Sequence, residues 1–327
     1  MLLQYILLIL GLVVLYFGAE AMVKGASQLA MLLGISPLVV GLTVVAFGTS
    51  APEFLVSMLA TMDGAEGISV GNIIGSNICN LALILGTAAL ISPLAISASS
   101  LKREYPIMLL SSLLFFGLAF TGSRLERWEG LILFVGIILF VGYNLSETFR
   151  SRRRPNKAQP EPGGDDVPEL EEGAVSKATY ARNLALVVFG LVGLAGGAQL
   201  MVVSASSIAR NFGISDFVIG TTIVAFGTSL PELATSVVAA LRKQSDISIG
   251  NILGSNIFNV MFIMGAVPMI FGMEVEARAL VIDFPIMVGV TLLTFPMMRT
   301  RYKISRAEGA FLLVVYTAYV VSLFIWP

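Results

Sequence analysis

The sequence is poor in charged side chains, which make up 13% of its 327 residues, while 56% of the residues are hydrophobic. A soluble protein of this length needs more charged surface, so the scarcity excludes an ordinary soluble domain. Histidine is absent, and Cys79 is the only cysteine. These absences exclude a disulfide framework, a His- or Cys-rich zinc site and a Ser-His-Asp or Cys-His catalytic centre. With a net charge of −1, nothing indicates a nucleic-acid partner.

Long apolar stretches recur along the whole chain and indicate a partner that is itself apolar, the lipid bilayer. A bilayer core is about 30 Å thick and requires roughly 20 apolar residues per helix. The sequence therefore predicts an all-α multi-pass membrane protein with ten transmembrane helices. No basic residue precedes Lys24, so the first stretch is interpreted as a retained helix rather than a signal peptide. The predicted spans are 2–28, 37–60, 68–92, 105–121, 129–148, 182–208, 216–240, 248–271, 282–298 and 308–326.

Residues 149–181 interrupt this pattern with a run of arginines followed by a stretch rich in proline, glycine and acidic residues. Such a composition is typical of a solvated linker. Its acidic side chains could instead form a weak regulatory cation site, and this alternative stays open. They are Asp165, Asp166, Glu169, Glu171 and Glu172.

The basic residues are distributed unequally between the two sets of alternate loops. One set, which includes the linker, carries 15 Lys and Arg residues, whereas the other carries 4. Because cytoplasmic loops retain basic residues, the linker is predicted to be cytoplasmic and both termini extracellular or periplasmic. The predicted location is the plasma (cytoplasmic) membrane.

An internal repeat with an offset of 179 residues relates the two halves of the chain. Residues 41–86 and 220–265 align without gaps and share 24 identities in 46 positions. The repeat predicts a first unit at 1–148 and a second at 182–327. Each unit has five spans, an odd number, so the second unit enters the membrane from the opposite side. Inverted repeats are typical of secondary transporters, whose ion sites lie near the midplane between the repeats.

The first repeated motif, Gly48-Thr-Ser-Ala-Pro-Glu53, predicts a broken helix lined with oxygen donors. Pro52 has no N–H, so the carbonyl of Gly48 loses its helical partner. Thr49, Ser50 and Glu53 add two hydroxyls and a carboxylate within one turn. The second copy repeats the same donors at Gly227, Thr228, Ser229, Pro231 and Glu232.

The two intramembrane glutamates have no repeated Lys or Arg partner. An unpaired carboxylate in the membrane is costly, so a bound cation is its natural countercharge. Carboxylates, hydroxyls and carbonyls are the ligands that Ca²⁺ prefers, and Na⁺ takes the same hard ligands. A protonated, hydrogen-bonded glutamate at a helix break is the alternative.

The second repeated motif, Gly-Asn-x-x-Gly-Ser-Asn-x-x-Asn, places polar residues on one face of a helix. Its glycines permit close helix packing, which offers a purely structural interpretation. We instead expect four of its side chains to line the site, while Asn77 and Asn256 are ambiguous. These four are Ser76, Asn80, Ser255 and Asn259.

Together the two motifs resemble the α-repeats of the sodium/calcium exchanger family within the calcium/cation antiporter superfamily. The resemblance covers nearly the whole chain and implies ten helices, alternating access and no cofactor. It implies a Ca²⁺ site formed by Thr49, Glu53, Thr228 and Glu232. It implies flanking Na⁺ sites that use Ala46, Ser50, Ala225, Ser229, Ser76, Asn80 and Ser255. Some members have aspartate at the position of Asn259, a form that the resemblance links with potassium coupling, so Asn259 argues against potassium dependence.

The resulting prediction is a Na⁺/Ca²⁺ antiporter, not an enzyme, that functions as a monomer because its site lies within one chain. The glutamates neutralise either one Ca²⁺ or several Na⁺, so both loads compete for the same ligands. Glycines on one side of the first and sixth helices are expected to let these helices slide across the core, and Glu20 is expected to pair with Lys24. A proton-coupled Ca²⁺ antiporter is the main alternative; a cation channel and an intramembrane hydrolase at Ser50 are others.

Overall fold

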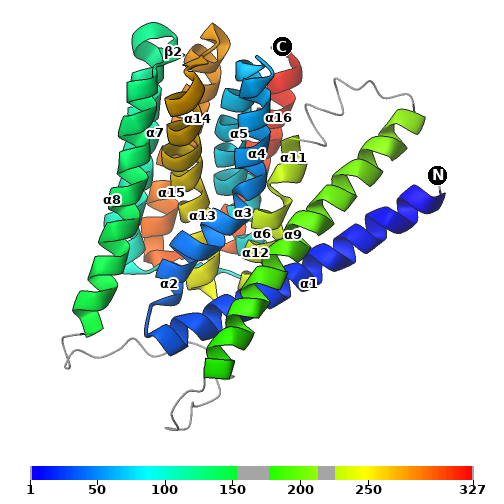
Figure 1. Ribbon diagram of the computed structural model, residues 1–327, viewed down its shortest axis with the longest axis vertical. Coiled ribbons are helices and arrows are strands. Elements are labelled where there is room, and N and C mark those ends of the chain that lie inside the picture. Colours follow the sequence, from blue (N-terminus) through cyan, green and yellow to red (C-terminus); the bar gives the residue numbers. More distant parts are fainter. Residues whose placement is uncertain (1, 153–176, 213–224, 326–327) are drawn as a thin grey trace.

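The computed structural model describes residues 2–152, 177–212 and 225–325, which are almost entirely helical (Figure 1). Its first half contains α1 (Leu2–Leu33), α2 (Pro37–Val40), η1 (Gly41–Val45), α3 (Ala46–Thr49), α4 (Ala51–Met62), α5 (Glu66–Ile78), η2 (Cys79–Ile84), α6 (Leu85–Ile91), β1 (Leu94–Ala95), η3 (Ser100–Glu104), α7 (Tyr105–Gly122), β2 (Arg124–Leu125) and α8 (Arg127–Arg152). Its second half contains α9 (Lys177–Asn211), α11 (Ala225–Thr228), α12 (Leu230–Leu241), α13 (Ser245–Ile257), η5 (Phe258–Ile263), α14 (Met264–Phe271), β3 (Met273–Glu274), η6 (Ala279–Asp283), α15 (Phe284–Arg299), η7 (Thr300–Tyr302), β4 (Lys303–Ile304) and α16 (Arg306–Ile325).

The helices match the predicted spans closely, and the chain is an all-α multi-pass membrane protein. Among the described residues, eight helices are long and apolar enough to cross a membrane, and the bent segment of Pro37–Thr49 and Ala51–Met62 makes a ninth. Of the predicted tenth span, 216–240, only α11 and α12 are described, so the count of ten stays a prediction. The linker prediction falls mainly on 153–176, outside the described residues, although helix extends to Arg152 before it and resumes at Lys177.

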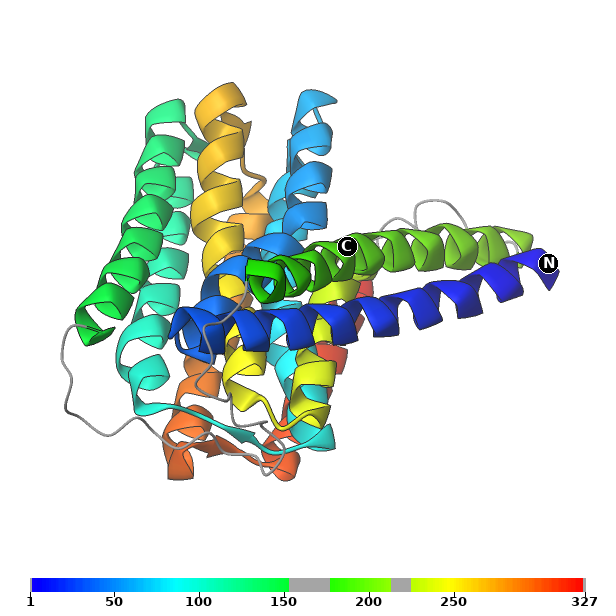
Figure 2. The ribbon, with the colours of Figure 1, turned by 60° about the horizontal axis from the view of Figure 1, so that its bottom comes forward.

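Two helices stand apart from the rest of the bundle. Helices α1 and α9 lie side by side and cross the other helices at a steep tilt, as Figures 1 and 2 show. The other long helices run roughly parallel to one another. The two most enclosed spans are Glu66–Ile91 and Ser245–Phe271. In the most apolar 18-residue stretch of each, 78% and 83% of the residues are buried, against 39% or less in the other long spans. These two central spans carry the second repeated motif.

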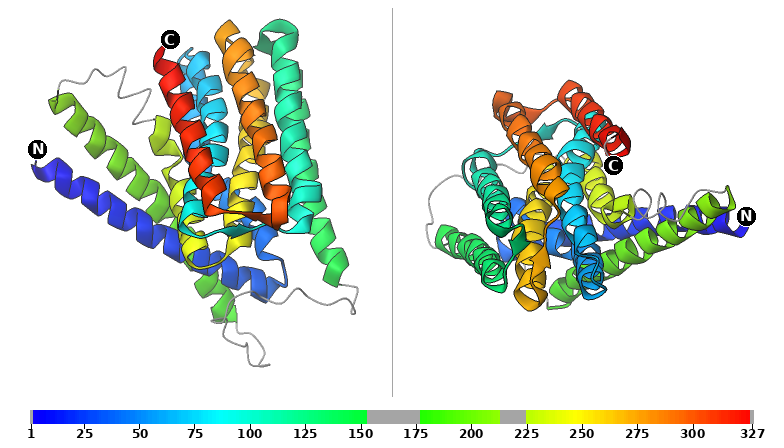
Figure 3. Two further views of the ribbon diagram at one scale, coloured as in Figure 1. Left: turned by 180° about the vertical axis from the view of Figure 1, so that it is seen from behind. Right: turned by 90° about the horizontal axis from the view of Figure 1, so that it is seen from above.

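Two short antiparallel strand pairs join the halves, and they are related to each other by the 179-residue offset of the repeat. Strand β1 pairs with β4, and β2 pairs with β3. The offset of 179 converts β1 into β3 and β2 into β4, so exchanging the halves converts one pair into the other. The pairs lie at opposite ends of the bundle, β2 at the top in Figure 1 and β4 at the bottom in the left view of Figure 3. This is the placement that an inverted repeat requires.

The helices also share irregularities at equivalent positions. The π-helical segments η2 and η5 are separated by the repeat offset, as are η3 and η6. A π-helical turn accommodates one extra residue and is frequent at functional sites. Both η2 and η5 lie within the enclosed spans and contain Asn80 and Asn259. The local distortion therefore coincides with the predicted site.

Candidate ion-binding site

The predicted helix break is present at equivalent positions in both halves. Helix α3 ends at Thr49 and α4 begins at Ala51, with a bend of 42° between the segments. Ser50 lies between them with φ −82° and ψ 6°, and Ser229 has nearly the same geometry, φ −86° and ψ 5°. A proline follows as the second residue of α4 and of α12, where its missing N–H is tolerated. The missing N–H of each proline leaves the carbonyl four residues earlier, that of Gly48 or Gly227, without its usual helical donor.

The two breaks are joined by reciprocal hydrogen bonds between the halves. The Ser50 hydroxyl donates to Glu232 Oε1 over 3.1 Å, and the Ser229 hydroxyl donates to Glu53 Oε1 over 3.2 Å. The Ser229 hydroxyl also lies 3.3 Å from Ser76 Oγ. Each carboxylate therefore sits against the broken helix of the opposite half, and both halves are needed to build the site.

A threonine of the opposite half lies beside each carboxylate, Thr228 beside Glu53 and Thr49 beside Glu232, yet one oxygen of each carboxylate has no well-aligned donor among the described residues. Glu53 and Glu232 are each 1% exposed, and Oε2 of each accepts no hydrogen bond within the described part of the chain. The two carboxylates also repel each other electrostatically. Glu129 on α8 provides a contrast, since it is 3% exposed but accepts from the Thr121 hydroxyl and from a backbone N–H. Because an unpaired buried carboxylate is costly, the arrangement fits a bound cation.

Two asparagine side chains add further open acceptors to the central helices. Asn80 and Asn259 are each 1% exposed, and neither Oδ1 accepts a hydrogen bond from the described residues. The Asn259 amide instead donates to Asn77 Oδ1 over 3.1 Å. An amide oxygen is a hard ligand of the kind that Ca²⁺ and Na⁺ accept. No described hydrogen bond links Asn80 or Asn259 to the glutamates.

The other predicted donors lie around the same breaks. The buried Thr49 hydroxyl lies 3.1 Å from Asn251 Oδ1 and 3.5 Å from Ser255 Oγ, and it donates to the Ala46 carbonyl over 3.3 Å. Thr228 is also buried. Ala225 begins α11, but its side chain lies outside the described residues. The described residues contain no cluster of three or more His, Cys, Asp or Glu side chains that could hold a metal ion. A cation at this site would therefore be bound by the two carboxylates and, for the rest of its ligands, by neutral oxygen atoms.

Sequence reasoning missed the residues that hold the broken helices in place. The Asn72 amide donates to the Glu53 carbonyl over 3.2 Å and to the Ser57 hydroxyl over 3.0 Å. Asn251 makes the equivalent bonds to the Glu232 carbonyl, over 3.3 Å, and to Ser236, over 2.9 Å. The available signal was identity under the 179-residue offset, because both asparagines and both serines are repeated.

Two expectations about the first helix require correction. Glu20 pairs with Arg242, at the turn after α12, rather than with Lys24. The glycine-rich sides of α1 and α9 face each other instead of the core. A Cβ on Gly18 would lie 3.1 Å from the Gly190 carbonyl oxygen, and a Cβ on Gly197 would lie 2.9 Å from the Gly11 carbonyl oxygen. These glycines hold the two tilted helices together.

Comparison with known proteins places this architecture in a family. A family model described as sodium/calcium exchanger protein matches residues 3–146 and 182–325. The chain is 37% identical to the putative antiporter CaxA of Alkalimonas amylolytica, covering 99% of both chains, and 34% identical to the sodium/calcium exchanger MaX1 of Methanosarcina acetivorans, covering 98% of both. A solved structure of the sodium-calcium exchanger NCX_Mj, soaked with Na⁺ and Sr²⁺, is 32% identical and superimposes with a TM-score of 0.82, covering 98% of this chain and 99% of that one. With both repeats matched and full-length relatives above 30% identity, this chain belongs to the sodium/calcium exchanger family.

Proposed function

We propose that this protein is a secondary active antiporter that exchanges Na⁺ for Ca²⁺ across a membrane. The observation that carries the proposal is the pair of buried glutamates, one from each inverted half, each with an open carboxylate oxygen. Its family membership and the names of its full-length relatives support the same activity. As a transporter it changes the location of its ions and performs no covalent chemistry, so it is not an enzyme.

The contacts at the two breaks support the ligand assignment that the family resemblance implies. Ca²⁺ is held by Glu53 and Glu232 together with the hydroxyls of Thr49 and Thr228. Na⁺ ions occupy flanking positions in its place, using Ala46, Ser50, Ser76, Asn80, Ala225, Ser229 and Ser255, and Asn259 also lines the site. Two carboxylates balance one Ca²⁺ or are shared by several Na⁺, and the reciprocal serine bonds tie each glutamate to the opposite half. Competition for these shared ligands couples the two ion movements.

The arrangement in the cell follows from the sequence. We place the protein in the cytoplasmic membrane as a functional monomer surrounded by lipid, with residues 149–181 as a cytoplasmic linker and both termini outside. The units 1–148 and 182–327 are the two repeats. The distribution of basic residues, 15 on the linker side against 4 on the other, supports this orientation. Because both halves of the site come from one chain, a second copy is not required.

The decisive experiment is uptake of radioactive Ca²⁺ by proteoliposomes that contain the purified full-length protein. Vesicles loaded with Na⁺ are diluted into Na⁺-free buffer at one clamped pH, and we expect Ca²⁺ accumulation that requires the outward Na⁺ gradient. Glu53→Gln and Glu232→Gln each preserve the side-chain shape and remove one charge, so both are expected to abolish uptake. Glu129→Gln is the matched control, because this buried glutamate lies in α8 with both oxygens satisfied.

Each alternative predicts a different result in the same vesicles. Uptake that ignores the Na⁺ gradient but follows a pH gradient would assign proton coupling. Ca²⁺ flux without any counter-ion movement would indicate a channel. Wild-type uptake by both glutamine variants would refute the site.

A further inference from the structure

A third glutamate shares the unusual state of the two at the exchange site. Glu104 is 5% exposed, and its Oε2 accepts no hydrogen bond within the described residues. It ends η3 and precedes α7, at the end of the bundle where α8 leads into residues 153–176. Its repeat equivalent is Asp283, so the position belongs to a duplicated motif, Glu104-Tyr-Pro-Ile-Met and Asp283-Phe-Pro-Ile-Met, that the exchange site does not use.

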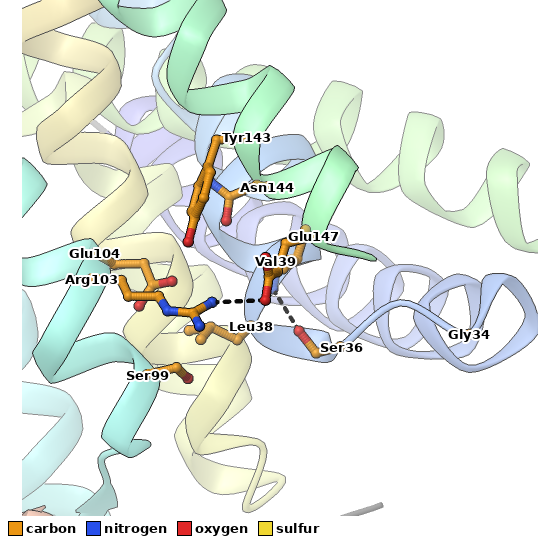
Figure 4. Close-up of a pocket in the computed structure, with 10 residues that line it drawn as sticks. All are labelled: Gly34, Ser36, Leu38, Val39, Ser99, Arg103, Glu104, Tyr143, Asn144 and Glu147. Atoms are coloured by element: carbon orange, nitrogen blue, oxygen red, sulfur yellow. Dashed lines mark hydrogen bonds and ion pairs between the residues drawn. The ribbon is translucent and has the colours of Figure 1, made fainter. Parts of the chain in front are cut away.

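Glu104 lines a cavity of about 150 Å³ between the α1–α2 turn, η3 and the end of α8 (Figure 4). The cavity contains two carboxylates and one guanidinium. Arg103 attracts Glu104, but its guanidinium donates to Glu147 Oε1 over 3.2 Å, and the dashed line in Figure 4 runs to Glu147. Among the described residues that line the cavity, the charges therefore sum to one net negative charge, and Glu104 keeps one oxygen that accepts no hydrogen bond. Neutral oxygen atoms from Ser36, Ser99 and Asn144 also line it.

The second half places an arginine beside the equivalent carboxyl from a different sequence position. Asp283 has a positive neighbour, Arg278, with which it interacts favourably. The residue that corresponds to Arg278 in the first half is Ser99, which lines the cavity and carries no charge. Each carboxyl thus has one arginine as an electrostatic neighbour, Arg278 for Asp283 and Arg103 for Glu104, but Arg103 also pairs with Glu147.

We propose that this cavity binds a small hard cation of the Ca²⁺ class and is a second ion site, separate from the exchange site. Carboxylate, hydroxyl and amide oxygens are the donors that such an ion prefers, and a cavity of this volume also admits some of its waters. The bound ion supplies the positive charge that Arg103, which also pairs with Glu147, leaves incomplete. The positions equivalent to Tyr143 and Asn144 hold Ser322 and Leu323, and the position equivalent to Glu147 holds Trp326, so the site is single rather than duplicated.

The cavity lies against the segment that leads into the exchange site. Ser36 caps α2 by accepting a hydrogen bond from the Val39 N–H over 3.3 Å, and both residues line the cavity. Helix α2 begins the broken helix that carries Glu53. An ion in the cavity ties this turn to η3 and α8, so its occupancy acts on the segment that joins α1 to the exchange site.

The test uses Tb³⁺, which shares the oxygen preference of Ca²⁺ and luminesces when a nearby tyrosine is excited; Tyr143 lines the cavity. The full-length protein in detergent carries Glu53→Gln and Glu232→Gln, which disable the exchange site. We expect a saturable Tb³⁺ signal that Ca²⁺ displaces. Adding Glu104→Gln, or Ser99→Arg to imitate the second half, is expected to abolish it. Asp283→Asn, the matched control at the opposite end, is expected to retain it.

A signal that survives both Glu104→Gln and Ser99→Arg would overturn the proposal, because the ion would then bind other acidic groups such as those of residues 165–172. Absence of any saturable signal in the double-glutamine protein would overturn it as well, and this result is expected if Glu104 is simply protonated. Neither result bears on antiport, since the exchange site is disabled in this experiment. Conversely, failure of Na⁺-driven uptake would leave the Tb³⁺ result intact.

Discussion

The contact between α1 and α9 offers a sharp test of the structure because adjacent glycines on one helix have opposite surroundings. A Cβ on Gly197 would lie 2.6 Å from the Leu15 backbone nitrogen and 2.9 Å from both the Gly11 carbonyl oxygen and the Leu15 Cα. A Cβ on Gly196 would meet no atom within 4 Å. The atoms near Gly197 belong to backbone, so they move only if the two helices separate.

This difference fixes the expected energies of Gly197→Ala and Gly196→Ala. Both substitutions gain the same helix propensity, about 1 kcal/mol. Only Gly197→Ala also overpacks the contact, which costs about 1–3 kcal/mol. The free energy of unfolding of Gly197→Ala should therefore lie about 1–3 kcal/mol below that of Gly196→Ala, a factor of roughly 5 to 150 in the equilibrium constant. Comparing the two variants cancels the propensity gain.

Thermal unfolding in detergent, followed by tryptophan fluorescence, measures this difference. At a shift on the order of 2 °C per kcal/mol, the midpoint of Gly197→Ala should fall roughly 2–6 °C below that of Gly196→Ala. Gly196→Ala should unfold at or above the wild-type temperature. Coincident midpoints for the two alanine variants would refute the reasoning, because they would mean that α1 and α9 do not approach closely at Gly197.

Two further substitutions test individual contacts. Asn72→Ala removes the donor to the Glu53 carbonyl and to Ser57. We expect the free energy of unfolding to fall by about 1–3 kcal/mol and Ca²⁺ to stabilise the variant less than the wild type. Full wild-type stabilisation by Ca²⁺ in a thermal-shift assay would contradict this role. Glu20→Gln breaks the ion pair with Arg242; the Glu20 and Arg242 side chains are 31% and 40% exposed. The loss in free energy of unfolding should therefore stay below about 1 kcal/mol and shrink with added salt. A salt-independent loss above about 2 kcal/mol in chemical unfolding would contradict a solvent-screened pair.

The predictions that succeeded depended on chemistry that each segment carries by itself. Pro52 lacks an N–H wherever it lies, so the helix break near Ser50 could be located from the sequence. Length and apolar composition likewise placed the spans to within a few residues. The repeat extended each prediction to the second half, because a feature at one position was expected again 179 residues later.

The predictions that failed depended on which distant segment lies opposite. Lys24 is one helical turn from Glu20, but the tilt of α1 brings it to the turn after α12, where Arg242 competes successfully for the carboxylate. The glycines of α1 were expected to let the helix slide across the core, because nothing local to α1 specifies α9 as the partner. The Asn72 amide bonds to the Glu53 carbonyl were missed for the same reason, since they join separate helices.

The repeat separates the features of this protein into two groups with different physical meanings. The helix breaks, the serine–glutamate bonds and the strand pairs all recur under the same offset, as expected of parts that must work alike from both sides of a membrane. The Glu20–Arg242 pair and the cavity around Glu104 do not recur: Gln199 replaces Glu20, and Arg278 replaces Ser99. An inverted transporter without such exceptions would have identical energies facing either side. The unrepeated contacts are therefore where a difference between its two access states must arise.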